Sequence, residues 1–116
     1  MPPEIKKHLY DILTAIGDLE AFVQNAEFDE LLSNRMLQAA VERKFEIIGE
    51  ALNRISKVDQ SYLNEIHDFK RIIGFRNIII HGYDLLDYEI LWDAATEKVI
   101  KLKTDVENLL TQNKED

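Results

Sequence analysis

The stretch that decides the fold is IKKHLYDILTAIGDLEAFV, residues 5–23. Its apolar side chains recur at steps of three and four residues, which is the period of one face of an amphipathic helix. They are Ile5, Leu9, Ile12, Leu13, Ile16, Leu19, Phe22 and Val23. Pro2 and Pro3 precede this run, and proline is well tolerated at the first turn of a helix. The pattern predicts that the chain opens with a long helix that buries one face.

The same period continues through the rest of the chain. Three further helical regions follow, over about 28–55, 63–80 and 92–109. Asp29 is the expected cap of the first of them, which is either longer than 25 residues or bent near Ser33-Asn34. The next helix is expected to stop near Gly82, since glycine readily takes the left-handed conformation after a last turn. Asp87 is the expected cap of the final helix.

Glycine and proline are placed so as to exclude sheet folds. Both prolines stand at positions 2 and 3, and there are four glycines in 116 residues. Sandwiches and barrels need turn residues every 8–12 residues or so, and α/β folds need β-branched strand blocks between helices. The chain is therefore predicted to be all-α, an antiparallel up-and-down four-helix bundle. We expect a single domain over residues 1–116, with a polar tail from about 111 to 116.

An excess of apolar residues on the third helix predicts self-association. Ile78, Ile79 and Ile80, flanked by Phe75 and Tyr83, cover most of a helix circumference. A monomer of this length cannot bury all of them, so part of this helix is expected to meet a second copy in a homodimer.

Composition restricts the location and the chemistry. No apolar run approaches the roughly 20 residues that span a bilayer, and the N-terminus lacks a signal-peptide core, so no membrane and a cytoplasmic location are expected. Without cysteine there are no disulfides or thiolate sites. The net charge of −8 argues against general nucleic-acid binding. However, residues 35–76 are weakly basic and hold every arginine of the chain.

The segment RNIIIHGY, Arg76 to Tyr83, carries the candidate chemistry. Histidine is the side chain best suited to proton transfer near neutral pH, and arginine matches phosphate geometry best. On an ideal helix Asn77 and His81 share a face, but Arg76 and His81 lie about 140° apart around the axis. Both reach one phosphate only if the helix ends at His81, if the long Arg76 side chain reaches across, or if a two-fold axis joins two copies.

Two segments resemble a known family. The spacing Arg-x4-His-x-Tyr from Arg76 to Tyr83 and the upstream Glu46–Ala51, EIIGEA, resemble the HEPN superfamily, in particular the HepT-like toxins of HepT/MntA toxin–antitoxin pairs. The resemblance extends from the first helix to Leu110. It implies a homodimeric, all-α endoribonuclease that uses no metal and no cofactor and cleaves mRNA or tRNA at the dimer interface.

The resemblance also implies a role for each motif residue. Arg76 would bind the scissile phosphate, His81 would transfer protons at the 2′-hydroxyl or the leaving oxygen, and Asn77 would orient one of these groups. Tyr83 would receive AMP from a partner, an MntA-like nucleotidyltransferase antitoxin, which silences the toxin. The nearby acidic residues Asp84 and Asp87 would repel RNA unless they face away.

Less specific interpretations remain open at this point. Arg76 could be an ordinary ion-pair residue, and His81 could simply cap the helix end. Glu50 is expected to partner an arginine rather than act as a catalytic acid, and Gly49 is expected to permit close helix packing. The alternative function is a non-catalytic module that binds a nucleotide or a nucleotidyltransferase, and a third reading is a bundle that only dimerises.

Overall fold

The computed structural model describes residues 1–82 and 86–112, and every element in these ranges is helical. In chain order the elements are α1 (Pro3–Val23), α2 (Phe28–Ser33), α3 (Arg35–Asp59), the 3-10 turn η1 (Gln60–Glu65), α4 (Phe69–His81), α5 (Tyr88–Asp93), the π-helical turn η3 (Ala94–Lys98) and α6 (Val99–Gln112). The all-α prediction is confirmed for the described residues.

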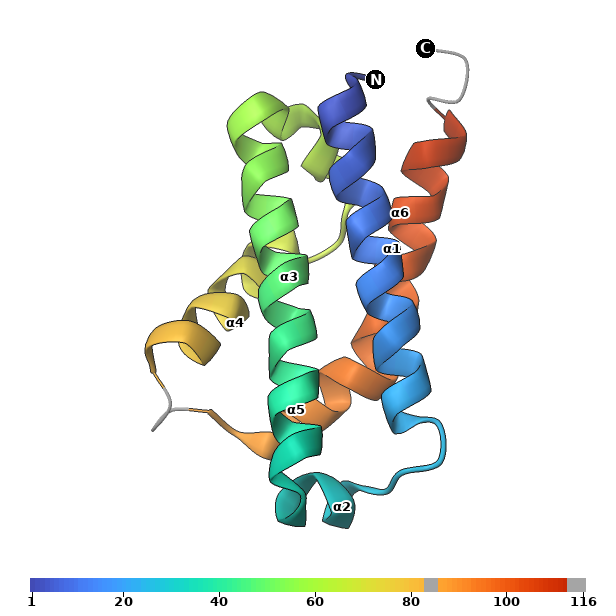
Figure 1. Ribbon diagram of the computed structural model, residues 1–116. Helices are drawn as coiled ribbons and strands as arrows, with labels where there is room; N and C mark the ends of the chain where they lie inside the picture. The colour runs from blue at the N-terminus through green and yellow to red at the C-terminus, as the bar shows by residue number, and fades with distance from the viewer. Residues whose placement is uncertain (83–85, 113–116) are drawn as a thin grey trace.

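Three long helices build the body of the molecule. In Figure 1, α1 runs between α3 and α6 and antiparallel to both, and α1 begins at the end where α6 stops. The apolar face predicted for α1 is the centre of the core: Ile5, Leu9, Ile12, Ile16 and Leu19 are fully buried. Burial of one side chain of this size contributes roughly 1.5–3 kcal/mol, so this face supplies much of the driving force for folding.

The fourth long segment is arranged differently. α4 packs mainly against α3 and leaves the bundle at an angle, with its last turn pointing outward (Figure 1). The prediction of an antiparallel up-and-down four-helix bundle is therefore not confirmed in a single chain. Among the residues that the structure describes, no second helix packs closely against the other face of α4.

The second helical region bends at Ser33-Asn34, one of the two predicted alternatives. Asn34 caps α3 by accepting a hydrogen bond from the Leu37 backbone N–H at 3.1 Å. The Gln38 side chain donates to the Leu31 carbonyl oxygen at 2.8 Å and fixes α2 against α3. The predicted Asp29 cap is wrong, because Glu27 precedes the helix and Asp29 lies inside its first turn.

The connection between α3 and α4 also differs from the prediction. The expected third helix from residue 63 is interrupted, because η1 ends at Glu65 and Asp68 takes a left-handed conformation with φ 59°. Only α4 continues to the predicted end. The Asp87 cap is confirmed, since its side chain accepts from the Glu89 backbone N–H at 2.8 Å.

The buried carboxylate of Asp105 on α6 fixes the turn before α4. It is 4% exposed and accepts from the His67 backbone N–H at 3.0 Å, while the His67 Nδ1 atom lies 3.1 Å from the same oxygen. Lys101 pairs with its other oxygen at 3.1 Å. Burial raises the pKa of Asp105, but the hydrogen bonds from His67 and Lys101 lower it by more, so that the pKa lies below its ordinary value of 3.8.

Replacement of this carboxylate is expected to remove an acid-sensitive part of the stability. Because its pKa is lower in the folded chain, ionised Asp105 stabilises the fold above about pH 4, and this contribution is lost as the pH falls through the folded value. Asp105→Asn is expected to lower the free energy of unfolding by about 1–3 kcal/mol at pH 7. Urea unfolding at pH 7 and at pH 3 should show the deficit shrinking in acid.

The matched control is Glu107→Gln, which removes an exposed carboxylate from the same helix. Exposed substitutions of this kind change the free energy of unfolding by less than about 0.5 kcal/mol. A deficit of Asp105→Asn that stays constant between pH 7 and pH 3 would contradict the assigned role of its charge.

Candidate active site

The end of α4 is formed as the sequence predicts, with one difference. The helix ends at His81, and the Gly82 backbone N–H donates to the Ile78 carbonyl oxygen at 2.8 Å. The predicted left-handed conformation of Gly82 is wrong, since its φ is −135°. The N–H of Gly82 continues the helical hydrogen-bond pattern to the fourth preceding residue.

The base of the Arg76 side chain packs directly against α3 at Gly49. A Cβ atom built at Gly49 would overlap the Cβ and Cγ atoms of Arg76, so only glycine at this position lets α4 approach so closely. This confirms the close helix packing expected at Gly49. The Arg76 side chain is 22% exposed as a result, and its Nε atom is buried without a hydrogen-bond partner in the described part of the chain.

Two side chains hold the Arg76 guanidinium in place. Its NH2 group donates to Glu50 Oε2 at 2.5 Å, and its NH1 group donates to Asn77 Oδ1 at 2.9 Å. The other Glu50 oxygen accepts from Arg54 Nε at 3.0 Å. Glu50 therefore lies between two arginines, one on its own helix and one on α4.

The charge state of Glu50 fits its predicted role as the partner of an arginine. The hydrogen bond from Arg54 is the largest influence on its pKa and lowers it; partial burial acts in the opposite direction. The positive charges of Arg76, Arg54 and Lys57 lower the pKa further. Glu50 is thus an anion at neutral pH and has no proton to donate as a general acid.

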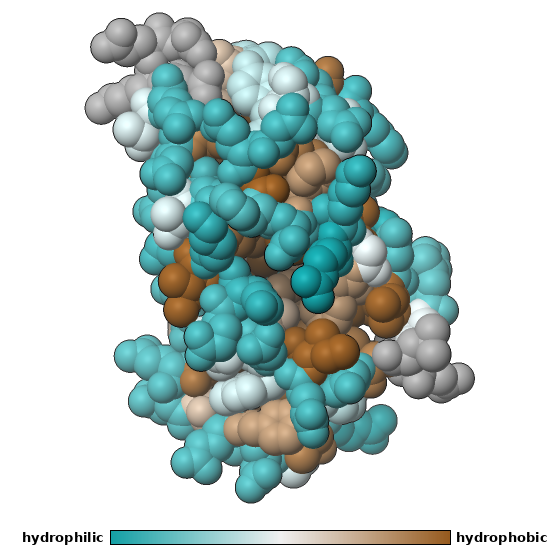
Figure 2. Space-filling model, turned by 180° about the vertical axis from the view of Figure 1, so that it is seen from behind, coloured by the Kyte–Doolittle hydropathy of each residue, from teal (hydrophilic) through white to brown (hydrophobic). Residues whose placement is uncertain are grey.

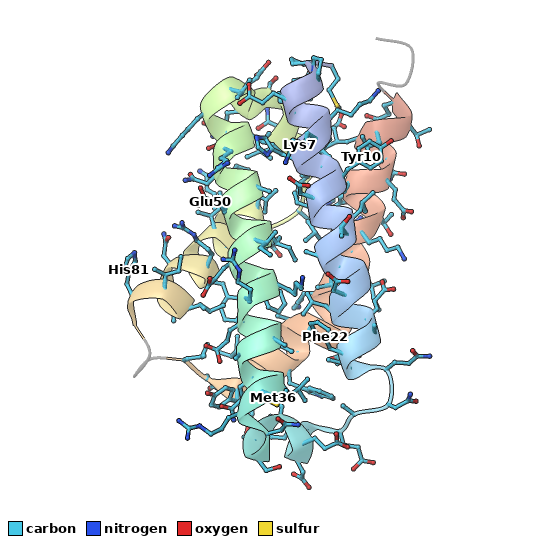
Figure 3. All side chains as sticks on the ribbon, in the orientation of Figure 1. Lys7, Tyr10, Phe22, Met36, Glu50 and His81 are labelled. Atoms are coloured by element: carbon cyan, nitrogen blue, oxygen red, sulfur yellow. The ribbon has the colours of Figure 1, made fainter. Side chains whose placement is uncertain are left out.

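His81 stands apart from this cluster. It projects from the outer end of α4, as Figure 3 shows, and it is exposed. Its side chain makes no hydrogen bond or ion pair with the residues that the structure describes. Along the regular helix α4 it lies about 7.5 Å beyond Arg76 and about 140° around the axis. Within one chain the structure brings Arg76, Asn77 and Glu50 together and leaves His81 outside that network.

Tyr83 and Asp84 lie outside the described residues. Asp87, the other acidic residue near the motif, is engaged as the cap of α5. Its carboxylate oxygen accepts a backbone hydrogen bond there, which partly balances its charge.

A wide groove opens on the unpaired face of α4. It has a volume of about 860 Å³ and lies between α4 and the α5–α6 segment. Its apolar lining includes Ile72, Phe75, Ile78 and Ile90, with Ile78 39% and Ile90 57% exposed. Figure 2 shows this apolar surface in the hollow of the rear face, between hydrophilic rims.

No group of three or more histidine or acidic side chains is arranged to hold a metal ion in residues 1–82 and 86–112. No helix in these ranges combines the length and the apolar character needed to cross a bilayer.

The sequence pointed to most of this cluster but missed two contacts. Arg54 was not singled out, although its position four residues after Glu50 is the usual spacing of a helical ion pair. The sequence assigns Asn77 to orienting a reacting group, and the structure adds that its amide oxygen accepts a hydrogen bond from Arg76. Adjacent helical residues do not normally face each other, so spacing gives no signal for this contact.

Comparison with known proteins agrees with the sequence resemblance. The family model described as "Ribonuclease HepT-like" matches residues 12–109. "Putative RNase MJ1380" of Methanocaldococcus jannaschii is 38% identical over 104 residues, which are 90% of this chain and 94% of the relative. "Probable ribonuclease HepT" of Thermococcus cleftensis is 34% identical over 104 residues, again 90% of this chain and 94% of the relative. No solved structure matches the chain. The chain belongs to the HepT-like ribonuclease family of the HEPN superfamily.

Proposed function

We propose that this chain is an endoribonuclease that cleaves RNA without a metal ion, at a site built from Arg76, Asn77 and His81. The observation that carries the proposal is the position of Arg76, whose guanidinium is held on Glu50 at 2.5 Å, on the same helix as the exposed His81. Membership of a ribonuclease family supports the same reaction class.

The proposed reaction uses the RNA's own 2′-hydroxyl. The 2′-oxygen attacks the neighbouring phosphorus as its proton passes to a base, the bond from phosphorus to the 5′-oxygen breaks, and the leaving oxygen takes up a proton. His81 serves one of these proton transfers. Arg76, fixed before the substrate arrives, stabilises the negative charge that develops on the phosphoryl oxygens. The product is a 2′,3′-cyclic phosphate, which can then be hydrolysed.

A homodimer completes the proposed site. Arg76 and His81 point about 140° apart on one helix, so one phosphate is better served by Arg76 of one copy and His81 of another. The apolar groove beside α4 is the surface that a second copy would cover. In this proposal, each single-domain chain supplies the packing surface that α4 lacks, and together the chains form the HEPN-like bundle.

In the cell, the protein is proposed to act as the toxin of a toxin–antitoxin pair in the cytoplasm. An MntA-like nucleotidyltransferase would silence it by adding AMP to Tyr83. Each AMP adds a phosphate and a bulky nucleoside two residues from His81, where it would compete with RNA for the arginine through charge and volume.

Cleavage of a chemically defined RNA tests the proposed function. The purified protein in excess EDTA is expected to cut tRNA or mRNA and to leave 2′,3′-cyclic phosphate ends. A single 2′-deoxy substitution at a mapped cut site should abolish cleavage there, because the attacking group is missing. Binding without cleavage across several RNAs would instead support the non-catalytic module.

A further inference from the structure

A second, smaller pocket lies between α1 and α3. It has a volume of about 180 Å³ and is lined by His8, Asp11, Arg43, Glu46, Ile47, Glu50, Ala51 and Arg54. Figure 3 looks onto the face where α1 and α3 run side by side, with Lys7 on one helix and Glu50 on the other. No part of the proposed reaction uses this pocket.

His8 is the observation that points to a ligand. It is 6% exposed, and its Nε2 atom is buried with no hydrogen-bond partner among the described residues. A buried polar group left unpaired costs about 1–3 kcal/mol, and native proteins contain few of them. His8 lies in α1 between the fully buried Ile5 and Leu9, where an apolar side chain would avoid this cost. His8 lines the pocket, and a turn of its imidazole ring would bring this nitrogen to a ligand there.

The lining restricts the chemistry of that ligand. Arg43 pairs with Glu46 at 3.1 Å, and Arg54 pairs with Glu50 at 3.0 Å. Asp11 pairs with Lys7 at 2.7 Å, and Glu50 also pairs with Arg76, so each carboxylate in the walls is balanced by a cation. A ring that presents both acceptors and donors fits such a surface. The volume agrees, since an engineered cavity of about 150 Å³ holds one benzene molecule.

Guanine is the nucleobase that matches this set of groups. Its O6 and N7 atoms are acceptors that arginine binds in a bidentate manner. Its N1–H and N2–H groups are adjacent donors, which suit the two oxygens of a carboxylate. Adenine presents only one amino group at the corresponding edge, so it would leave a carboxylate oxygen unpaired.

Glu50 connects this pocket to the site on α4. One of its oxygens pairs with Arg54 in the pocket wall, and the other pairs with Arg76. A base in the pocket would therefore lie close to a phosphate bound at Arg76. We propose that the pocket between α1 and α3 binds a guanine base of the RNA strand beside the scissile phosphate. This inference rests on the proposed ribonuclease function.

Nucleotide binding to the whole chain carrying His81→Ala tests the pocket separately from cleavage, because this variant lacks the proposed proton-transfer residue. Guanosine monophosphate is expected to bind at least tenfold more tightly than the adenosine, cytidine and uridine monophosphates in calorimetric titrations. Arg43→Ala, at the exposed rim, is expected to weaken guanosine monophosphate binding about tenfold or more, as for loss of one bidentate base contact. His8→Phe, which removes the ring nitrogens with little change in volume, should weaken binding by a comparable factor.

Lys57→Ala is the matched control, because it removes an exposed cation from α3 outside the pocket. It should leave the affinity for guanosine monophosphate unchanged. If His8→Phe fails to fold by circular dichroism, Arg43→Ala and the base preference decide the result. Equal binding of all four nucleotides, or no loss of binding in Arg43→Ala, would overturn the guanine pocket.

Mapping of the RNA cut sites, with the unaltered chain and with Arg43→Ala, is a second test of the pocket. Cut sites are expected to lie beside guanine, and Arg43→Ala is expected to shift their distribution toward other bases. Guanosine monophosphate binding without any RNA cleavage would keep the pocket and reject the ribonuclease. Cleavage without guanine preference or guanosine monophosphate binding would reject the pocket and keep the ribonuclease.

Discussion

RNA cleavage by the Arg76→Ala variant is expected to fall about 100- to 1000-fold, the usual loss when one preorganised charge-stabilising donor is removed. His81→Ala is expected to lose about 100-fold or more, as for removal of a general acid or base. The rates are measured with the pure proteins in EDTA on one RNA with a mapped cut site. The two losses have different causes, since Arg76 stabilises charge and His81 moves a proton.

Lys70→Ala is the matched control for the charge of Arg76. Lys70 is an exposed cation on the same helix, so its loss reports the general electrostatic attraction of RNA to α4. Its cleavage rate should remain within a few-fold of the unaltered chain. A loss in Lys70→Ala as large as that in Arg76→Ala would contradict a specific role for Arg76.

Mixing the two inactive variants tests the shared site. If Arg76 of one copy works with His81 of another, a dimer of one Arg76→Ala chain and one His81→Ala chain contains one intact pair. Random exchange of subunits would then restore about a quarter of the full activity, because half of the dimers are mixed and each has one complete site of two. No recovery, with exchange verified, would place both residues of a working site in one chain.

Local signals in the sequence predicted most of the helical regions, but only some of their ends. The apolar period of residues 5–23 gave α1 and its buried face, and Asn34 and Asp87 mark the starts of α3 and α5. These features depend on side chains a few residues apart. The direction of α4 depends instead on Asp68, whose left-handed conformation no neighbouring residue requires, and on the long-range bonds of Asp105.

The candidate site likewise combines features that a local motif predicts with a contact that only the packing of two helices creates. Arg76 and His81 follow from a motif within one helix, and so does the end of α4. The contact of Arg76 with Glu50 joins residues 26 positions apart and requires two helices to touch at Gly49. The sequence suggested that Glu50 partners an arginine but could not say which one, since Arg54 is the nearer candidate along the chain. The structure assigns one Glu50 oxygen to each.

The largest effect outside the catalytic side chains is expected for Gly49→Ala. In an open helix this change stabilises by just under about 1 kcal/mol, because alanine has the higher helix propensity. Here the new Cβ overlaps the Cβ and Cγ atoms of Arg76, which lie at the base of the side chain and cannot swing aside. Overpacking of this kind costs about 1–3 kcal/mol, so the free energy of unfolding should fall.

Gly49→Ala should lose more cleavage activity than its loss of stability alone explains. Either α4 moves away from α3 or Arg76 leaves Glu50, and a displacement of about 1 Å at a catalytic group can cost about 100-fold in rate. Gly17→Ala is the control, because a Cβ there meets no atom within 4 Å on the exposed side of α1. It should gain about 0.5–1 kcal/mol and keep its cleavage rate. If both variants became more stable and stayed equally active, the close approach of the helices at Gly49 would not be what positions Arg76.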